Sequence, residues 1–137
     1  MITVQGVRQL IYLTGTRLVS LDPEDGSLFF ELPWKTSYDV NAATPVLVPP
    51  DRVFIASGYS TGGALFQLTP DSEGTRVTRL WTAPRMRNQF SSSIFYEGHL
   101  YGFDNSTLKC LDAATGEEKW AVREGFGHGS LTLADGH

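Results

Sequence analysis

One short pattern occurs twice in this chain of 137 residues and strongly limits how the chain can fold. An apolar, strand-like segment runs into Asp22, and Gly26 follows four residues later; Asp112 and Gly116 repeat this spacing. An aspartate can accept hydrogen bonds from the amides ahead of it, and a glycine can adopt the positive φ that ends a turn. Both copies therefore predict a hairpin between two strands. An aromatic residue follows each glycine after four residues, namely Phe30 and Trp120.

A weaker third copy lies between the first two, over residues 64–74, and Trp81 follows it. Aligning Leu21, Leu68 and Leu111 gives steps of 47 and 43 residues. A repeat of about 40 to 50 residues that alternates apolar and polar positions is typical of a four-stranded propeller blade. The sequence therefore predicts an all-β fold, a β-propeller of four-stranded antiparallel blades. We expect the aromatic residue of each unit to lie in the outer strand and to pack on the neighbouring blade.

Turn signals divide the chain into three blades and the start of a fourth. The blades are expected at roughly 1–34, 42–84 and 90–124, and a strand at 129–133 is expected to open a fourth unit over 128–137. Propellers close with about four to eight blades, so three blades should leave the ring incomplete in the monomer. We expect either a fragment of a longer propeller or a subunit that completes its ring with further copies of itself.

Charge and composition argue against several classes of function. The net charge of -4 does not favour nucleic acid, because phosphates are not attracted to a weakly acidic protein. No run is long and apolar enough for a transmembrane segment, and Met1 is not followed by a stretch of signal-peptide type. Cys110 is the single cysteine, so no internal disulfide is expected, and its place within a strand predicts a buried side chain.

The stretch Asp112-Ala113-Ala114-Thr115-Gly116-Glu117-Glu118-Lys119-Trp120 resembles the PQQ-like repeat, whose pattern is an apolar strand, Asp-Ala-x-Thr-Gly, charged residues and a tryptophan. The first copy matches less well because Phe30 stands where tryptophan is usual, and the copy before Trp81 matches least. Residues 33–45 also look like a segment of PQQ-like repeat proteins. This resemblance covers nearly the whole chain and implies a bacterial propeller, periplasmic or exported.

The family with this repeat includes quinoprotein alcohol dehydrogenases and non-enzymatic relatives, such as the propeller lipoprotein of the outer-membrane β-barrel assembly machinery. Its enzymes hold PQQ and a calcium ion on the propeller axis, with a catalytic aspartate and a disulfide of adjacent cysteines over the quinone. Here Cys110 is alone, and no Asp or Glu lies in a context that matches the calcium ligands. We therefore expect no cofactor and no metal, with PQQ and calcium as the alternative.

Longer loops are expected at one end of the blades, because alternating strand directions bring the second-to-third strand turns and the connections between blades to the same face. Functional residues concentrate in such loops. Arginines beside aromatics suit a carboxylate, a phosphate or a peptide. The alternative is that Trp34 and Tyr38 pack between blades and that the arginines are only solvated. The candidate ligand or partner residues are Trp34, Lys35, Tyr38, Asp39, Asn41, Tyr59, Arg85, Arg87, Asn88 and His128.

The segment Gly58-Tyr59-Ser60-Thr61-Gly62 fits the Gly-x-Ser-x-Gly pattern of a nucleophile elbow. That device requires a strand that leads into a helix, whereas strand-like sequence resumes at Ala64. Ser60 is therefore expected in a hairpin, and no catalytic residue is assigned.

The leading hypothesis is a non-catalytic binding or assembly scaffold that presents its loops to a protein, a peptide or a small ligand. Two alternatives stay open. One is part of a PQQ- and calcium-dependent quinoprotein dehydrogenase, and the other is a truncated or engineered propeller piece with no activity of its own. The expected partner is another protein or further copies of this chain.

Overall fold

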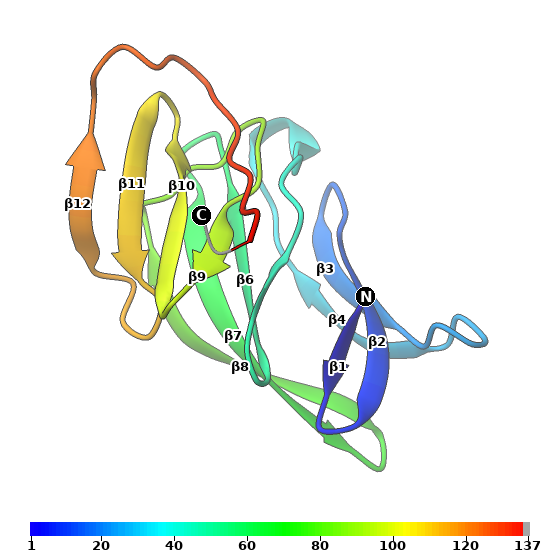
Figure 1. Ribbon diagram of the computed structural model, residues 1–137. Helices are drawn as coiled ribbons and strands as arrows, with labels where there is room; N and C mark the ends of the chain where they lie inside the picture. The colour runs from blue at the N-terminus through cyan, green and yellow to red at the C-terminus, as the bar shows by residue number, and fades with distance from the viewer. Residues whose placement is uncertain (136–137) are drawn as a thin grey trace.

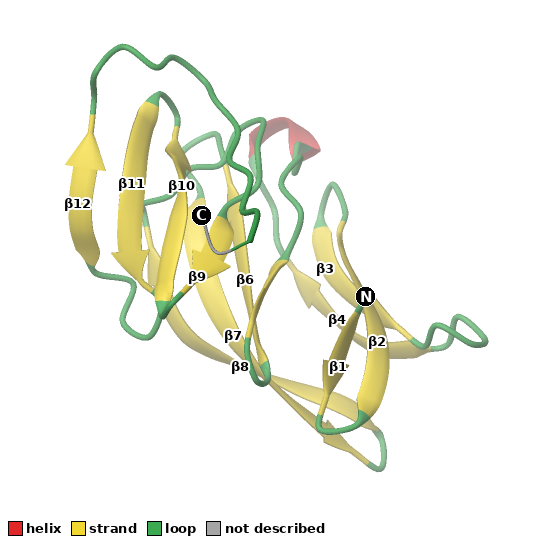
Figure 2. Ribbon diagram, in the orientation of Figure 1, coloured by secondary structure: helices red, strands yellow, loops and turns green. Residues whose placement is uncertain are grey.

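The computed structural model describes residues 1–135 and contains three four-stranded antiparallel sheets (Figure 1). Within each sheet the strands follow one another in chain order, so short turns join neighbouring strands. The sheets stand face to face like consecutive blades (Figure 2), and apolar side chains fill the space between them. The predicted all-β fold of four-stranded blades in an incomplete ring is therefore confirmed.

The strands are numbered along the chain. Blade I contains β1 (Ile2–Val4), β2 (Val7–Leu13), β3 (Arg17–Leu21) and β4 (Leu28–Pro33). Blade II contains β5 (Val46–Val48), β6 (Arg52–Ser57), β7 (Gly62–Asp71) and β8 (Gly74–Ala83). Blade III contains β9 (Ile94–Tyr96), β10 (His99–Asp104), β11 (Thr107–Asp112) and β12 (Glu118–Val122). A short 3-10 turn, η1 (Ser37–Asp39), lies in the connection between blades I and II.

The two Asp-to-Gly turns have the same backbone geometry. The amides of Asp22 and Asp112 each donate a hydrogen bond of 2.8 Å to the carbonyl five residues ahead. The amides of Gly26 and Gly116 donate back to the aspartate carbonyl over 3.0 and 2.8 Å. Both glycines have positive φ, +76° and +74°, as such a turn requires. The hairpins expected at both places form.

A β-bulge at the same place in each blade defines the repeat. The pairing of the third strand with the fourth shifts immediately before Leu21, Phe66 and Leu111. These three residues are therefore equivalent, and both steps of the repeat are 45 residues long. The expected equivalence of Leu68 is wrong by two residues. The reason is that the β7–β8 hairpin of blade II is longer than the last hairpins of blades I and III. Its turn therefore lies further from the bulge than the turns of those blades do.

The long hairpin of blade II reaches across to blade I (Figure 1). Near its tip, Thr75 accepts a hydrogen bond of 3.0 Å from the buried amide of Gln9, and Gln9 accepts one of 2.8 Å from Ser20. Gly74 passes so close to Phe29 that a Cβ atom there would lie 2.6 Å from the Phe29 carbonyl oxygen. The extra length thus adds a polar contact between the first two blades.

Two apolar layers hold the blades together. We call the side of a sheet that faces the following blade its trailing face, and the opposite side its leading face. The first layer joins Val4, Leu18, Phe30 and Trp34 to the leading-face residues Val53, Ile55, Ala64, Phe66 and Leu68 of blade II. The second joins Val48, Phe54, Ala56, Leu65 and Met86 to Leu100, Leu111 and Ala113 of blade III. Each interface has the same arrangement, as a repeat predicts.

The aromatic residue of each repeat packs on the next blade only where such a blade is present. Phe30 is buried against blade II, and Trp81 packs in the layer between blades II and III. Trp120 has the equivalent register, opposite Cys110, yet 42% of its surface is exposed. The expected packing of Trp120 is therefore not found, because none of residues 1–135 forms a blade beyond it.

Residues 129–133, expected to start a fourth blade, do not form a strand. This segment returns over blade III, where Gly129 packs on the ring of Phe103 and Leu133 reaches the edge of β9 (Figure 1). A strand requires a hydrogen-bonded neighbour, and no described strand pairs with this segment. The last two residues of the expected fourth unit, 136–137, lie outside the described residues.

Candidate functional site

The longer connections gather at one end of the blades, as expected from the alternating strand directions (Figure 2). We call this end the loop face. It carries all ten residues predicted as ligand or partner contacts. Its segments are 14–16, 34–45, 58–61, 84–93, 105–106 and 123–129.

Trp34 lies inside the protein rather than on the loop face surface. Its side chain is only 9% exposed, and its ring meets Phe66 edge to face with centroids 6.3 Å apart. The indole nitrogen donates a hydrogen bond of 2.9 Å to the hydroxyl of Ser57. These contacts join the end of blade I to blade II, so Trp34 has a structural role in this state of the protein.

Asn41 fastens the connection between blades I and II to the rest of the loop face. Its amide nitrogen donates hydrogen bonds of 2.9 Å to the carbonyl oxygens of Thr14 and Gly15 in the turn between β2 and β3. Its amide oxygen accepts a hydrogen bond from the Ser57 hydroxyl. Trp34, Asn41 and Ser57 therefore form one chain of hydrogen bonds that holds this connection in place.

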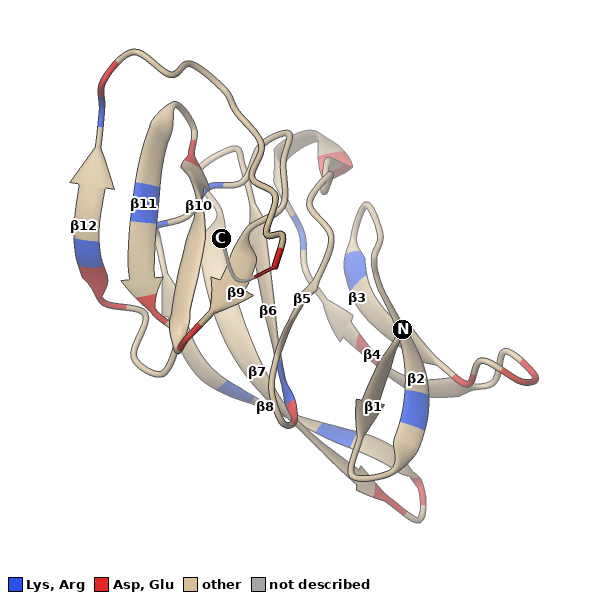
Figure 3. Ribbon diagram, in the orientation of Figure 1, with Lys and Arg blue, Asp and Glu red and all other residues tan. Residues whose placement is uncertain are grey.

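Arg87 and Lys109 lie on either side of the buried carboxylate of Asp104. Figure 3 marks the charged positions along the ribbon, among them a basic residue within β11. Arg87 binds both carboxylate oxygens, and Lys109 lies 2.8 Å from Asp104 and 2.9 Å from Glu118. Burial by itself would raise the pKa of Asp104, but the hydrogen bonds from Arg87 and Lys109 outweigh it and lower that pKa to about 2. The hydrogen bond to Asp104 likewise raises the pKa of Arg87. The Asp104 carboxylate thus stays ionised. Because the Arg87 guanidinium is bound to this carboxylate, it is less available to an external ligand.

Asn88 is buried beside this ion cluster. Its amide nitrogen donates a hydrogen bond of 3.1 Å to the carbonyl oxygen of Phe103, and its amide oxygen accepts one of 2.8 Å from Ser93. The backbone amide of Asn105 donates to the carbonyl oxygen of Arg87. The connection between blades II and III is therefore built onto blade III by buried polar contacts, which are costly to leave unpaired.

Two tyrosines form an exposed pair on the loop face. The rings of Tyr38 and Tyr59 meet edge to face with centroids 5.6 Å apart, and Tyr38 is 84% exposed. Both residues have positive φ, +67° and +51°, and so do their neighbours Asp39 and Ser60. Side chains other than glycine rarely adopt this backbone region, and such outliers concentrate at functional positions. The structure therefore holds these tyrosines outward at a conformational cost.

A second aromatic pair lies further along the loop face. Phe90 is 65% exposed, and its ring meets His128 edge to face with centroids 5.1 Å apart. Phe126 is also exposed, at 52%. A Cβ atom on Gly58 would lie 3.0 Å from Gln89, so the loop with Tyr59 touches the loop with Phe90. Phe90 and Phe126 were not among the predicted residues. The usable signal was an aromatic in a polar loop, three residues after Arg87 for Phe90 and between two glycines for Phe126.

The remaining predicted residues are charged and exposed. Lys35, Asp39 and Arg85 lie at the surface of the loop face. Lys35 also borders a shallow hollow of about 300 Å³ that reaches Trp34 and Pro84. The ten predicted residues fall into three groups. Trp34 and Asn88 are buried, and Asn41 and Arg87 are half-buried and bonded to other parts of the protein. The six exposed residues are Lys35, Tyr38, Asp39, Tyr59, Arg85 and His128.

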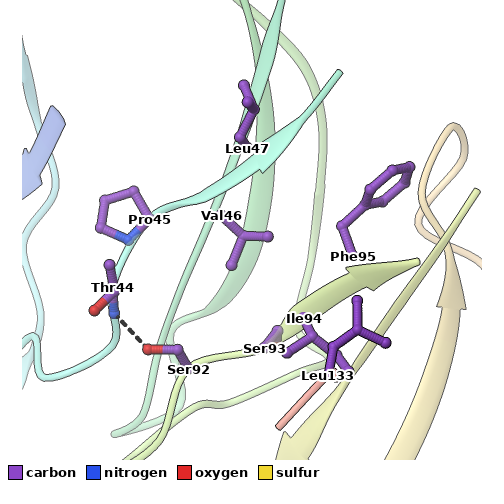
Figure 4. Close-up of a pocket in the computed structure, with 9 residues that line it drawn as sticks. All are labelled: Thr44, Pro45, Val46, Leu47, Ser92, Ser93, Ile94, Phe95 and Leu133. Carbon is purple, nitrogen blue, oxygen red and sulfur yellow. Dashed lines mark hydrogen bonds between the residues drawn. The ribbon is translucent and has the colours of Figure 1, made fainter. Parts of the chain in front are cut away.

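A separate groove of about 460 Å³ runs between the first strands of blades II and III (Figure 4). Its walls are mostly apolar, and none of its lining side chains is charged. A hydrogen bond of 2.8 Å from the amide of Thr44 to the hydroxyl of Ser92 bridges its two sides. The lining residues are Thr44, Pro45, Val46, Leu47, Ser92, Ser93, Ile94, Phe95 and Leu133.

Residues 1–135 contain neither a candidate metal site nor a membrane-spanning helix. In this range no three or more His, Cys, Asp or Glu side chains are grouped so that they could hold a metal ion. The same residues include no helix with the length and apolar character that a membrane crossing needs. Ser60 follows strand β6 in a hairpin turn rather than in a strand-to-helix elbow, as expected.

Comparison with known proteins shows that this chain resembles a solved structure in its fold. No protein-family model and no curated protein matches the sequence. Among solved structures, the chain is similar to the crystal structure of BamB from Moraxella catarrhalis, with a TM-score of 0.63 and 16% sequence identity. The match covers 97% of this chain but 43% of BamB, so the chain spans less than half of that neighbour's length. At this identity the likeness shows a propeller-like fold and no more.

Proposed function

We propose that this chain is a non-catalytic propeller scaffold that binds a protein partner through the loop face. The observation that carries the proposal is the set of exposed aromatics there: Tyr38, Tyr59, Phe90 and Phe126. Large exposed aromatics on one surface are costly in a monomer and are enriched where proteins bind one another. The four residues are called the loop-face aromatics below.

The surroundings of the loop-face aromatics suit a protein interface. Lys35, Asp39 and Arg85 are exposed on the connections that carry Tyr38 and Phe90, and they offer charges of both signs for a polar rim. The aromatic pairs Tyr38 with Tyr59 and Phe90 with His128 restrain one another, which lowers the entropy lost when a partner binds.

Four of the predicted contact residues are hydrogen-bonded within the protein, which also supports binding rather than catalysis. Arg87, Asn88, Asn41 and Trp34 each make contacts that hold the loops in place. Residues that are engaged in this way position a surface rather than act on a substrate. The likeness to BamB supports a propeller scaffold but names no partner for this chain.

Site-specific photo-crosslinking in the native cells tests the proposal. A photoreactive phenylalanine analogue is placed at Tyr38 or Phe90, and, as a matched control, at Glu73 in the turn at the opposite end of blade II. We expect the two loop-face positions to capture the same protein and Glu73 to capture none. The double variant Tyr38→Ala and Phe90→Ala should remove co-purification of that protein while the fold is kept. Equal capture at all three positions, or no capture at any, would contradict the proposal.

A further inference from the structure

The contact between blades II and III shows how one blade receives the aromatic residue of the blade before it. The indole nitrogen of Trp81 donates a hydrogen bond of 3.1 Å to the carbonyl oxygen of Ala113. The ring of Trp81 lies over Gly116, where a Cβ atom would come within 2.8 Å of it. The Asp-to-Gly turn therefore acts as a receptor for the preceding tryptophan, because its glycine leaves space for the ring.

Blade III presents the donor half of this contact, and within residues 1–135 nothing receives it. Trp120 lies at the register of Trp81, and Tyr101 lies at the register of Phe54 on the same face. The rings of Tyr101 and Trp120 have centroids 6.0 Å apart, and 42% of Trp120 is exposed. This trailing face repeats the surface that blade II buries against blade III.

Blade I presents the receptor half, also without a partner among the described residues. Its turn from Asp22 to Gly26 has the hydrogen bonds and glycine φ of the turn that receives Trp81. Gly116 is buried, whereas Gly26 is exposed and nothing lies within 4 Å of a Cβ atom placed on it.

The strands beside this turn are also uncovered. Leu10 and Leu21 on the leading face of blade I correspond to Leu100 and Leu111, which are both 0% exposed in blade III. In blade I both leucines are partly exposed, and Tyr12 and Leu28 on the same face are 48% and 53% exposed. An apolar sheet face of this kind is costly in water and favours a partner.

We propose that a second copy of this chain docks head to tail, with Trp120 of one copy on the Asp22-to-Gly26 turn of the next. In this arrangement the Trp120 indole donates to the carbonyl oxygen of Pro23, which stands where Ala113 stands in blade III. The occupant is a second copy because both unpaired halves of an interface already built twice in the molecule are carried by one chain. This inference uses a surface separate from the loop face and does not depend on the loop-face proposal.

The symmetry of the contact follows from its two different halves. A surface that joins one patch to a different patch is heterologous, so copies add in one direction until the rotation closes a ring or continues as a filament. Each added copy contributes three blades. Each new contact buries the Trp120 of one copy against the next copy. Assembly should therefore depend on concentration and should bury Trp120.

Sedimentation and light scattering of the purified chain over a wide concentration range test this. We expect masses above that of the monomer at high concentration, with a shift of tryptophan emission to shorter wavelength as Trp120 is buried. Trp120→Ala should weaken the association about 30-fold or more, the effect typical of a central interface tryptophan. Phe90→Ala removes an exposed aromatic from the loop face instead and should leave the association unchanged.

Mixing two variants tests the head-to-tail geometry. Trp120→Ala keeps the receptor half, and Leu21→Asp keeps the donor half, so each alone should stay monomeric and the mixture should form a dimer that cannot grow. Circular dichroism checks that both variants fold, and Pro23→Lys replaces Leu21→Asp if the latter does not. A wild-type chain that stays monomeric at every concentration, Trp120→Ala that associates like wild type, or a mixture that yields only monomers would overturn the proposal.

Discussion

The Trp81 indole and the Ala113 carbonyl oxygen share a hydrogen bond of 3.1 Å across the boundary between blades II and III. The same tryptophan ring covers Gly116, which closes the turn that begins at Asp112. The turn therefore has two roles, since it ends a hairpin and receives the preceding blade. Stability of the array should be concentrated in this contact, because the blades are joined in sequence by side chains rather than by strand pairing.

Trp81→Ala should lower the free energy of unfolding by about 3 kcal/mol, because it removes a large packed ring and a hydrogen bond between blades. Trp120→Ala is the matched control, since Trp120 occupies the same register in blade III and is 42% exposed. In the monomer it should cost less than about 1 kcal/mol. Denaturant titration of both variants at low protein concentration measures the difference. Similar losses for the two variants would show that blade III does not depend on the Trp81 contact.

The glycines that close the two turns provide a second comparison. Gly26→Ala places a Cβ atom at positive φ but in open space, so it should cost about 1 kcal/mol. Gly116→Ala has the same backbone cost and also places a Cβ atom 2.8 Å from the ring of Trp81. We expect a further loss of about 1 to 3 kcal/mol from this overlap. Thermal unfolding of the two variants checks this, and equal shifts in melting temperature would contradict it.

Asp104 should make the protein sensitive to acid. Its folded-state pKa of about 2 lies below the ordinary value of 3.8, so the unfolded chain binds a proton more readily. The stability that this carboxylate contributes is therefore complete above pH of about 4 and is lost as the pH falls towards 2. The shift corresponds to about 2 kcal/mol. Comparing the stability of wild type and Asp104→Asn between these pH values measures this contribution, and the difference between them should shrink as the pH falls.

At neutral pH, Asp104→Asn should itself lower stability by about 3 kcal/mol, because it leaves the nearly buried Lys109 with Glu118 as its remaining acidic partner. Asp71→Asn is the control, since the pair of Asp71 with Arg76 is exposed and should contribute about 0.5 kcal/mol or less. A pH profile of Asp104→Asn that parallels wild type would assign the acid sensitivity to other carboxylates.

Two aromatics on the connection between blades I and II should contribute very differently to the stability of the fold. Trp34→Ala should cost about 3 kcal/mol, because Trp34 is buried and its indole nitrogen binds Ser57. Tyr38→Ala should change stability by less than about 0.5 kcal/mol, since its side chain is 84% exposed. Chemical denaturation separates the two effects. A large loss for Tyr38→Ala would mean that this ring supports the fold rather than a binding surface.

Much of the fold could be predicted because the repeat carries its own signals. Asp22 and Gly26, like Asp112 and Gly116, mark hairpins through backbone chemistry that does not depend on the rest of the protein. The register of blade II could not be found in this way. Its turn near Gly74 lies further from the bulge at Phe66, and only the contact of that hairpin with Gln9 and Phe29 explains the extra length.

The end of the blades at which the longer loops lie could be predicted, but the contacts within those loops could not. From the sequence, Arg87 and Asn88 were predicted to be ligand contacts. Their actual partners, Asp104 and Phe103, are distant in sequence. The residues next to Arg87 and Asn88 therefore gave no indication of these internal hydrogen bonds. A short loop sequence also does not show whether an aromatic side chain such as Phe90 is exposed or buried. The orientation of a loop side chain depends on tertiary packing, which residue type alone does not encode.

A double-mutant cycle between Trp81 and Gly116 tests most directly whether the turn is the receptor for the preceding blade. The free energy of unfolding is measured for wild type, Trp81→Ala, Gly116→Ala and the double variant. If the ring packs on this glycine, Gly116→Ala should cost at least about 1 kcal/mol less once Trp81 is removed, because only the backbone cost at positive φ is left. Strictly additive losses would contradict the contact and, with it, the way in which these blades are held together.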